Sequence, residues 1–152
     1  MLQSKFPQVK SLRDANCGML RQISPKMPEN ISKRCYHVVT ENARVLEATD
    51  ALLKGDFQLL GQLMYGSHYS LQNDYEVSCP ELDFLVKQTE KKEYILGSRM
   101  MGGGFGGCTI NLIEKEKIKP FIELVSKNYR NQFGIDLTPY TVSIGNGATL
   151  VN

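Results

Sequence analysis

Apolar residues recur at helical spacing over residues 31–54, and the pattern predicts one long helix there. Gly55 supplies a stop, because glycine readily adopts the left-handed conformation that ends many helices. Asp56 can cap a second helix, whose apolar positions run from residue 57 to residue 64. The two helices, joined by Gly55 and Asp56 alone, are expected to form an antiparallel hairpin.

Two more helices follow in the second half of the chain. Ser78 and Glu81 have the spacing of a capping box, and Pro80 falls in the first turn, so this pattern predicts a helix that ends near Lys91. The last helix has the most regular apolar spacing in the sequence, with Gly134 as its expected stop. Its apolar positions are Ile118, Phe121, Ile122, Val125 and Tyr129.

Segments of strand character lie between and after these helices. Residues 94–100, 109–113 and 140–144 are rich in β-branched, aromatic or alternating apolar residues, and residues 149–151 predict a last short strand. Residues 9–12 predict a further short strand near the start. Helices and strands do not alternate in a regular βαβ order, so the predicted class is α+β.

A run of glycines joins the first two of these strands. The sequence MGGGFGGCTIN covers residues 101–111 and places five glycines among the six residues 102–107. A hairpin turn that needs positive φ is one explanation, and close approach of bare backbone to a ligand is the other. Phe105 interrupts the run and is expected to anchor the loop to a core. The residues alone leave both explanations open.

Three common phosphate-binding motifs do not fit this run. Gly102, Gly104 and Gly107 match G-x-G-x-x-G, but a dinucleotide fingerprint opens a helix, whereas a strand is predicted after Gly107. A Walker A loop ends in Gly-Lys-Ser/Thr, and this run ends in Gly-Cys-Thr. A protein-kinase glycine loop requires HRD and DFG partners, which the sequence lacks.

Composition narrows the class further. With 152 residues, 41% of them hydrophobic and 22% charged, the chain is predicted to form one domain over residues 1–152. A formal charge of +2 argues against a nucleic-acid or membrane partner. Four scattered cysteines without a CxxC pair, and only two histidines, do not form a zinc pattern. The cysteines suit a reducing compartment, so a soluble, cytoplasmic protein without a bound metal is expected.

Several side chains are candidates for chemistry, and none is predicted to be catalytic. His68 lies at the end of a predicted helix with no recognisable nucleophile beside it, so we expect a capping or structural role, and His37 lies within a helix. Arg99 precedes the glycine run and is expected to be a surface charge or ion-pair member. The sequence also holds a group of acidic residues expected to serve the third helix: Asp74, Glu76, Glu81 and Asp83.

Residues 97–108, GSRMMGGGFGGC, resemble the third signature of the GHMP small-molecule kinases in the form found in the galactokinase family. The resemblance extends to HVV at 37–39, SH at 67–68 and DYEVSCPELD at 74–83, and to further short matches. These further matches are EN at 41–42, RV at 44–45, LM at 63–64, SL at 70–71 and GA at 147–148. The family implies a ferredoxin-like C-terminal domain, a four-stranded antiparallel sheet with helices packed on it, in which residues 9–12 would supply the remaining strand.

The resemblance also implies an activity, the transfer of the γ-phosphoryl group of MgATP to the anomeric hydroxyl of galactose. In that setting Gly102, Gly103, Gly104, Phe105, Gly106 and Gly107 would lie beside the sugar and the phosphates. Met101 stands where the family usually has threonine. ATP and magnesium are the implied cofactors, with their ligands mainly outside this sequence.

The family's sugar signature G-R-x-N-L-I-G-E-H and phosphate loop G-L-S-S-S-A do not occur in these 152 residues. The resemblance therefore predicts a C-terminal domain that docks on its own N-terminal domain and has no turnover alone. One alternative is a galactokinase-like sensor that binds sugar and nucleotide and docks on a regulatory protein. Another is an interaction module that exposes an apolar surface and self-associates.

Overall fold

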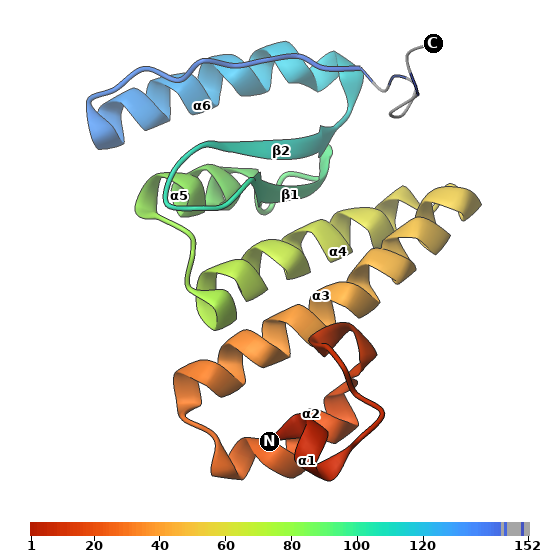
Figure 1. The fold of residues 1–152 in the computed structure, drawn as a ribbon. Helices are drawn as coiled ribbons and strands as arrows, with labels where there is room; N and C mark the ends of the chain where they lie inside the picture. The colour runs from red at the N-terminus through yellow and green to blue at the C-terminus, as the bar shows by residue number, and fades with distance from the viewer. Residues whose placement is uncertain (144, 146–149, 151–152) are drawn as a thin grey trace.

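The computed structural model describes residues 1–143, 145 and 150 (Figure 1). The helices are α1 (Leu2–Lys5), α2 (Cys17–Ile23), α3 (Glu29–Lys54), α4 (Phe57–Ser70), α5 (Pro80–Thr89) and α6 (Ile118–Phe133). The strands are β1 (Ile95–Met101) and β2 (Cys108–Ile113). The short turns are η1 (Leu12–Asp14), η2 (Ser24–Lys26), the π-helix η3 (Leu71–Tyr75) and η4 (Lys115–Lys117).

The elements are stacked in layers. In Figure 1, α6 and α4 lie on opposite sides of the β1–β2 hairpin, α3 lies beyond α4, and the N-terminal helices pack on α3. One apolar cluster joins Ile95 of β1 to Phe121 and Val125 of α6. A second joins Leu20 and Ile23 of α2 to α3. The glycine loop therefore extends from a hairpin that is covered by helices on both sides.

The predicted α3–α4 hairpin is confirmed. Gly55 ends α3 in the left-handed conformation with φ of 70°, and the carboxylate of Asp56 accepts a hydrogen bond from the Leu59 N–H at 2.9 Å. Both caps are local and were readable from residue type. The last helix is also confirmed, and Gly134 ends it with φ of 71°.

β1 and β2 pair antiparallel, from Ile95 with Ile113 to Met101 with Cys108. α4 packs directly on β1 because two glycines face each other. A Cβ atom placed on Gly61 would lie 1.9 Å from the Leu96 carbonyl oxygen, and one on Gly97 would lie 2.5 Å from the Gly61 Cα. The backbones of helix and strand are therefore in contact at this point, with no room for a side chain.

The predicted capping box of α5 is wrong. The helix begins at Pro80, its N-cap is Cys79, and no side chain caps it. The Ser78 hydroxyl instead donates to Oδ1 of Asp83 at 2.5 Å. Ser78 lies one residue before the N-cap position, so its side chain bonds to this carboxylate and does not cap the helix. The helix ends at Thr89, two residues before the predicted end.

Two predicted strands are not present where the structure describes them. Residues 9–12 form no strand, because the Ser11 and Asp14 side chains cap the 3-10 turn η1. Residues 140–143 also belong to no strand, and Tyr140 and Val142 are exposed; position 144 and most of 149–151 lie outside the described residues. Helices on an antiparallel sheet are confirmed, but the described residues supply two strands, and the four-stranded detail is not confirmed.

None of the helices in the described residues combines the length and the apolar character needed to cross a bilayer.

Candidate functional site

Residues 102–107 form the connection between β1 and β2. Four of the five glycines have positive φ, namely Gly102, Gly104, Gly106 and Gly107, and residues with a side chain are strained in that conformation. Gly103 is the exception. The hairpin explanation therefore accounts for four glycines, and the fifth, Gly103, has no conformational reason to be glycine.

One point of this loop is pinned to the rest of the domain. The Phe105 N–H donates to the Val77 carbonyl oxygen at 2.8 Å. A Cβ atom on Gly104 would lie 2.0 Å from that same oxygen, so only glycine permits this approach. Val77 is itself held by its N–H, which donates to the carbonyl of Leu71 at 3.1 Å. Backbone thus packs on backbone at Gly104.

The rest of the loop faces open space. Cβ atoms added to Gly102, Gly103 or Gly106 would meet no atom within 4 Å. Phe105 has φ of 58° and is 78% exposed, so the prediction that it anchors the loop in a core is wrong. The anchor is the backbone hydrogen bond of Phe105, and its ring points away from the domain's own core. On this side the loop therefore presents bare backbone that no other described residue covers within 4 Å of these three positions.

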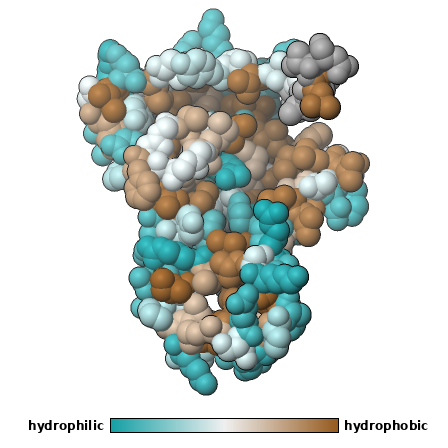
Figure 2. Space-filling view, in the orientation of Figure 1, coloured by the Kyte–Doolittle hydropathy of each residue, from teal (hydrophilic) through white to brown (hydrophobic). Residues whose placement is uncertain are grey.

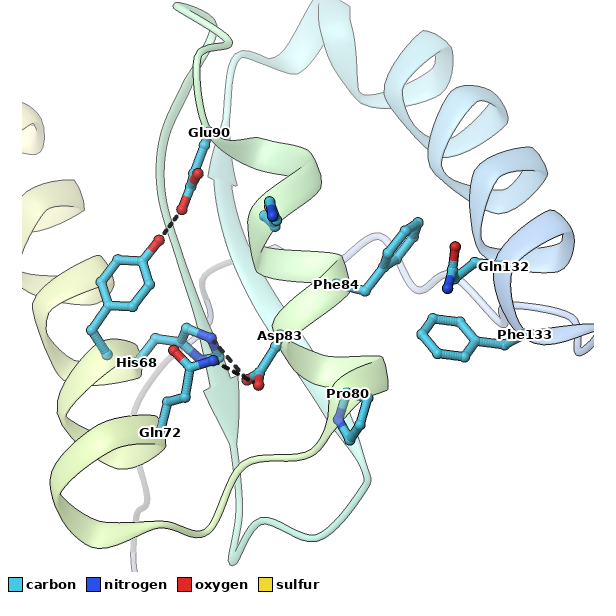
Figure 3. A pocket seen from close by; sticks show the side chains of 10 residues that line it. His68, Gln72, Pro80, Asp83, Phe84, Glu90, Gln132 and Phe133 are labelled. Carbon is cyan, nitrogen blue, oxygen red and sulfur yellow. Dashed lines mark hydrogen bonds and ion pairs between the residues drawn. The ribbon is translucent and has the colours of Figure 1, made fainter.

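Behind the loop lies a buried histidine. His68 of α4 is 1% exposed; its Nδ1 accepts a hydrogen bond from the Met100 N–H at 3.4 Å, and its Nε2 lies 3.5 Å from Oδ1 of Asp83. Asp83 also accepts from Nε2 of Gln72 at 2.7 Å (Figure 3). Both ring nitrogens of His68 are therefore engaged by the domain's own groups.

His37 belongs to a second buried network. The Ser70 hydroxyl donates to Asp74 at 2.8 Å, and Nδ1 of His37 lies 3.0 Å from the same hydroxyl oxygen. Because the Ser70 proton is directed at Asp74, Nδ1 of His37 must carry the proton and donate. The ring also stacks on Tyr75 with centroids 4.6 Å apart. The imidazole is thus a donor to Ser70 and is not placed as a base for it.

The stability of the domain is expected to fall as the pH drops below 6.5. Burial lowers the pKa of His37 and of His68 below 6.5, although Glu41 and Asp83 respectively act in the opposite direction. Below that pH the unfolded chain therefore takes up protons that the folded chain does not, and the free energy of unfolding decreases. Urea unfolding at about pH 7.5 and about pH 5.5 measures the loss. The variant His37→Gln should show a smaller difference between the two; an equal difference would contradict this assignment.

The other sequence candidates are dispersed. Glu76 forms an ion pair with Arg34 at 2.8 Å, while Asp83 and Asp74 belong to the separate networks of His68 and His37. Arg99 donates to the Met100 carbonyl at 3.1 Å. Within the described part of the chain, no group of three or more histidine, cysteine or acidic side chains could hold a metal ion.

A cavity of about 440 Å³ lies beside the His68 network, between α4, α5 and α6. Phe84 and Phe133, whose ring centroids are 5.3 Å apart, line one side, and Glu90 lies at another (Figure 3). Lys87 also lines the cavity. No glycine-loop residue lines it. Sequence reasoning did not anticipate this cavity or the role of Val77, because a backbone carbonyl has no signature in residue type.

Residues 48–131 match the family model described as GHMP kinases C terminal. The galactokinase of Thermotoga maritima is 44% identical over 143 residues, which are 94% of this chain and 40% of that protein. The galactokinase of Roseiflexus sp. is 38% identical over 146 residues, 96% of this chain and 37% of that protein. The chain thus spans about two fifths of the length of these relatives.

A solved structure agrees with these sequence matches. The structure of Lactococcus lactis galactokinase complexed with galactose superposes with a TM-score of 0.89 at 33% identity, and the match covers 97% of this chain and 38% of that one. The family match covers the helical hairpin from residue 48, the glycine loop and most of α6, and the matched relatives are galactokinases. The chain therefore belongs to the GHMP kinases, as a C-terminal domain of that family.

Proposed function

We propose that this chain is the C-terminal domain of a galactokinase, which transfers the γ-phosphoryl group of ATP to the C1 hydroxyl of galactose. The observation that carries the proposal is the loop at residues 102–107, which packs on the Val77 carbonyl at Gly104 and has free space at Gly103. This loop occurs in a chain that is 33% identical to a galactokinase whose structure was solved with galactose. Phosphoryl transfer depends chiefly on positioning and on charge stabilisation. A loop of bare backbone can approach both reactants closely because no side chain intervenes.

The described residues fit only part of what such a reaction needs. The open backbone around Gly103 and Gly106 suits the close approach of a sugar or a phosphate group. Magnesium, which would neutralise charge on the transferred phosphates, prefers carboxylate oxygens, and the described residues offer no cluster of such ligands. We therefore assign the metal ligands and most ATP contacts to an N-terminal domain similar to the part of the longer relatives that this chain does not match. This chain contributes the loop. The four free cysteines suit a cytoplasmic location.

The 152-residue chain alone is expected to show no galactose-dependent ATP turnover. The reason is that the proposed phosphate and metal ligands lie outside it, so removing them removes the electrostatic stabilisation of the transition state. A coupled assay of ADP release with galactose and MgATP measures this. A longer galactokinase chain that carries this domain serves as the positive control. Clear turnover by the 152-residue chain would contradict the assignment of the chemistry to another domain.

A second candidate role, a protein-interaction module, rests on exposed apolar side chains at the tip of the α3–α4 hairpin. Leu52, Leu53 and Phe57 are 53%, 82% and 49% exposed, and apolar residues gather there in Figure 2. Surface of this kind drives association. Light scattering of the chain is expected to give a mass above 17.1 kDa that falls to that value in the variant Leu53→Asp. The exposed Leu150→Asp variant is the control, and a monomer at all concentrations would remove this role.

A further inference from the structure

The glycine loop is held to the domain at two points. On the β1 side, the Met100 N–H donates to Nδ1 of His68, two residues before Gly102. Within the loop, the Phe105 N–H donates to the carbonyl of Val77. These two anchors are contributed by different elements, the end of α4 and the segment between η3 and α5. The loop can keep one geometry only if these two elements keep their relative positions.

One carboxylate joins the two elements. Oδ1 of Asp83 lies 3.5 Å from Nε2 of His68 and 2.5 Å from the hydroxyl of Ser78. Ser78 follows Val77 directly in the chain, so the carboxylate is linked to both anchors. Its second oxygen accepts from Gln72 at 2.7 Å, which fixes the rotation of the group. Asp83 is on α5, and Figure 3 shows its side chain directed toward His68 and Gln72.

We propose that His68 and Asp83 are positioning residues that hold the 102–107 loop at fixed points, at its β1 end and at Phe105, without touching a ligand. We call His68, Asp83 and Ser78 the loop clamp. The inference deepens the proposed galactokinase function and rests on it for its catalytic consequence. The hold of these residues on the loop does not depend on that function, because it concerns only the hydrogen bonds of the Met100 and Phe105 amides.

The hydrogen bonding of the clamp determines the form of the histidine. Because the Met100 N–H is a donor, Nδ1 of His68 must present its lone pair, and the ring proton therefore lies on Nε2, facing Asp83. The ring is neutral in this arrangement, and a second proton on Nδ1 would oppose the Met100 N–H. The charged and titratable groups around the ring are Asp83 and Lys87 of α5, Glu90 directly after α5, Arg99 of β1 and the neighbouring Tyr69.

Amide hydrogen exchange of the ¹⁵N-labelled 152-residue chain tests the clamp without any substrate. In Asp83→Ala we expect exchange at both the Met100 and the Phe105 amides to accelerate at least about tenfold, while amides in the middle of α6 change less. The matched control is Tyr65→Phe. It removes the 2.8 Å bond between Tyr65 and Thr89, which also joins α4 to α5 but does not reach the loop.

The clamp is overturned if the Met100 and Phe105 amides in Asp83→Ala respond no more than in Tyr65→Phe. It is also overturned if Phe105 alone responds, because Asp83 would then act through Ser78 and not through His68. If Asp83→Ala does not fold, Asp83→Asn is assessed by the same two amides, with at least about a threefold acceleration expected at each.

The two roles of His68 can be separated by conservative variants. His68→Asn retains an acceptor near the position of Nδ1, so the Met100 amide is expected to stay protected, whereas His68→Phe keeps the bulk, loses the acceptor and should expose that amide. Equal exchange in the two variants would contradict the assignment. Because exchange is read without galactose or ATP, failure of the clamp and failure of the proposed kinase function are distinguishable.

Discussion

Replacing Gly61 with alanine is expected to destabilise the domain by about 3 kcal/mol, the upper range for overpacking a well-packed interior. The new methyl group would lie 1.9 Å from the carbonyl oxygen of Leu96, and the atoms it meets are backbone atoms of β1. A change of side-chain rotamer cannot relieve this clash between the new methyl group and the strand backbone, so α4 must move away from β1. Such a loss corresponds to a fall of roughly 6–12 °C in melting temperature for a chain of this size, measured by thermal unfolding.

Gly66→Ala on the same helix is the matched control. A methyl group there would meet the side chain of Arg44 at 3.3 Å, and a flexible side chain can shift. Alanine also favours helix over glycine by about 1 kcal/mol, so the net change should stay within about 1 kcal/mol. Equal destabilisation by the two variants would show that the contact of Gly61 with β1 is not what limits this position.

In a longer galactokinase chain carrying this domain, Gly104→Ala is expected to lower kcat/KM for galactose about 100-fold, the loss that a misplacement of about 1 Å can cause. The added methyl group would lie 2.0 Å from the Val77 oxygen at a residue whose φ is 87°. The loop must therefore release its hydrogen bond to Val77. Stability should also fall by about 2 kcal/mol, from strain and the lost contact.

Gly103→Ser separates function from folding in the same loop. The serine Cβ meets no atom within 4 Å, and Gly103 is not at positive φ, so the melting temperature should not change. Activity should nevertheless decrease, because the side chain occupies the face proposed for the reactants. Unchanged kinetics in Gly103→Ser would argue against a functional loop, and unchanged stability in Gly104→Ala would argue against the contact with Val77.

The parts of the fold that were predictable are those set by local signals. Periodicity and caps adjacent in sequence placed α3, α4 and α6, and segments of strand character on either side of the glycine run placed β1 and β2. Competition between equivalent groups caused the errors. The Ser78 hydroxyl bonds to Asp83 in place of the predicted capping box with Glu81, and the strand predicted at 9–12 gives way to a 3-10 turn that begins at Leu12 and is capped by Ser11 and Asp14.

The position of the candidate site was predictable, and its attachment was not. Five glycines between two strands identify the loop from sequence alone. The partner of Gly104 is a backbone carbonyl, and the partner of Met100 is a side chain 32 residues earlier, so neither leaves a local pattern. An apolar residue was expected to be buried, but Phe105 sits where its backbone turns outward.

The π-helix η3 fixes the length of the chain at its position, and not only the residue types. Its wider turn follows α4 directly and brings Asp74 and Tyr75 to Ser70 and His37. A π-helical turn holds one residue more than an α-helical turn, so deleting one residue between 71 and 73 would allow ordinary α-helical winding and leave the direction of the chain after it nearly unchanged. The deletion would, however, shorten the spacing between Ser70 and Asp74 from four residues to three, so the Asp74 carboxylate would change its position in the His37 network.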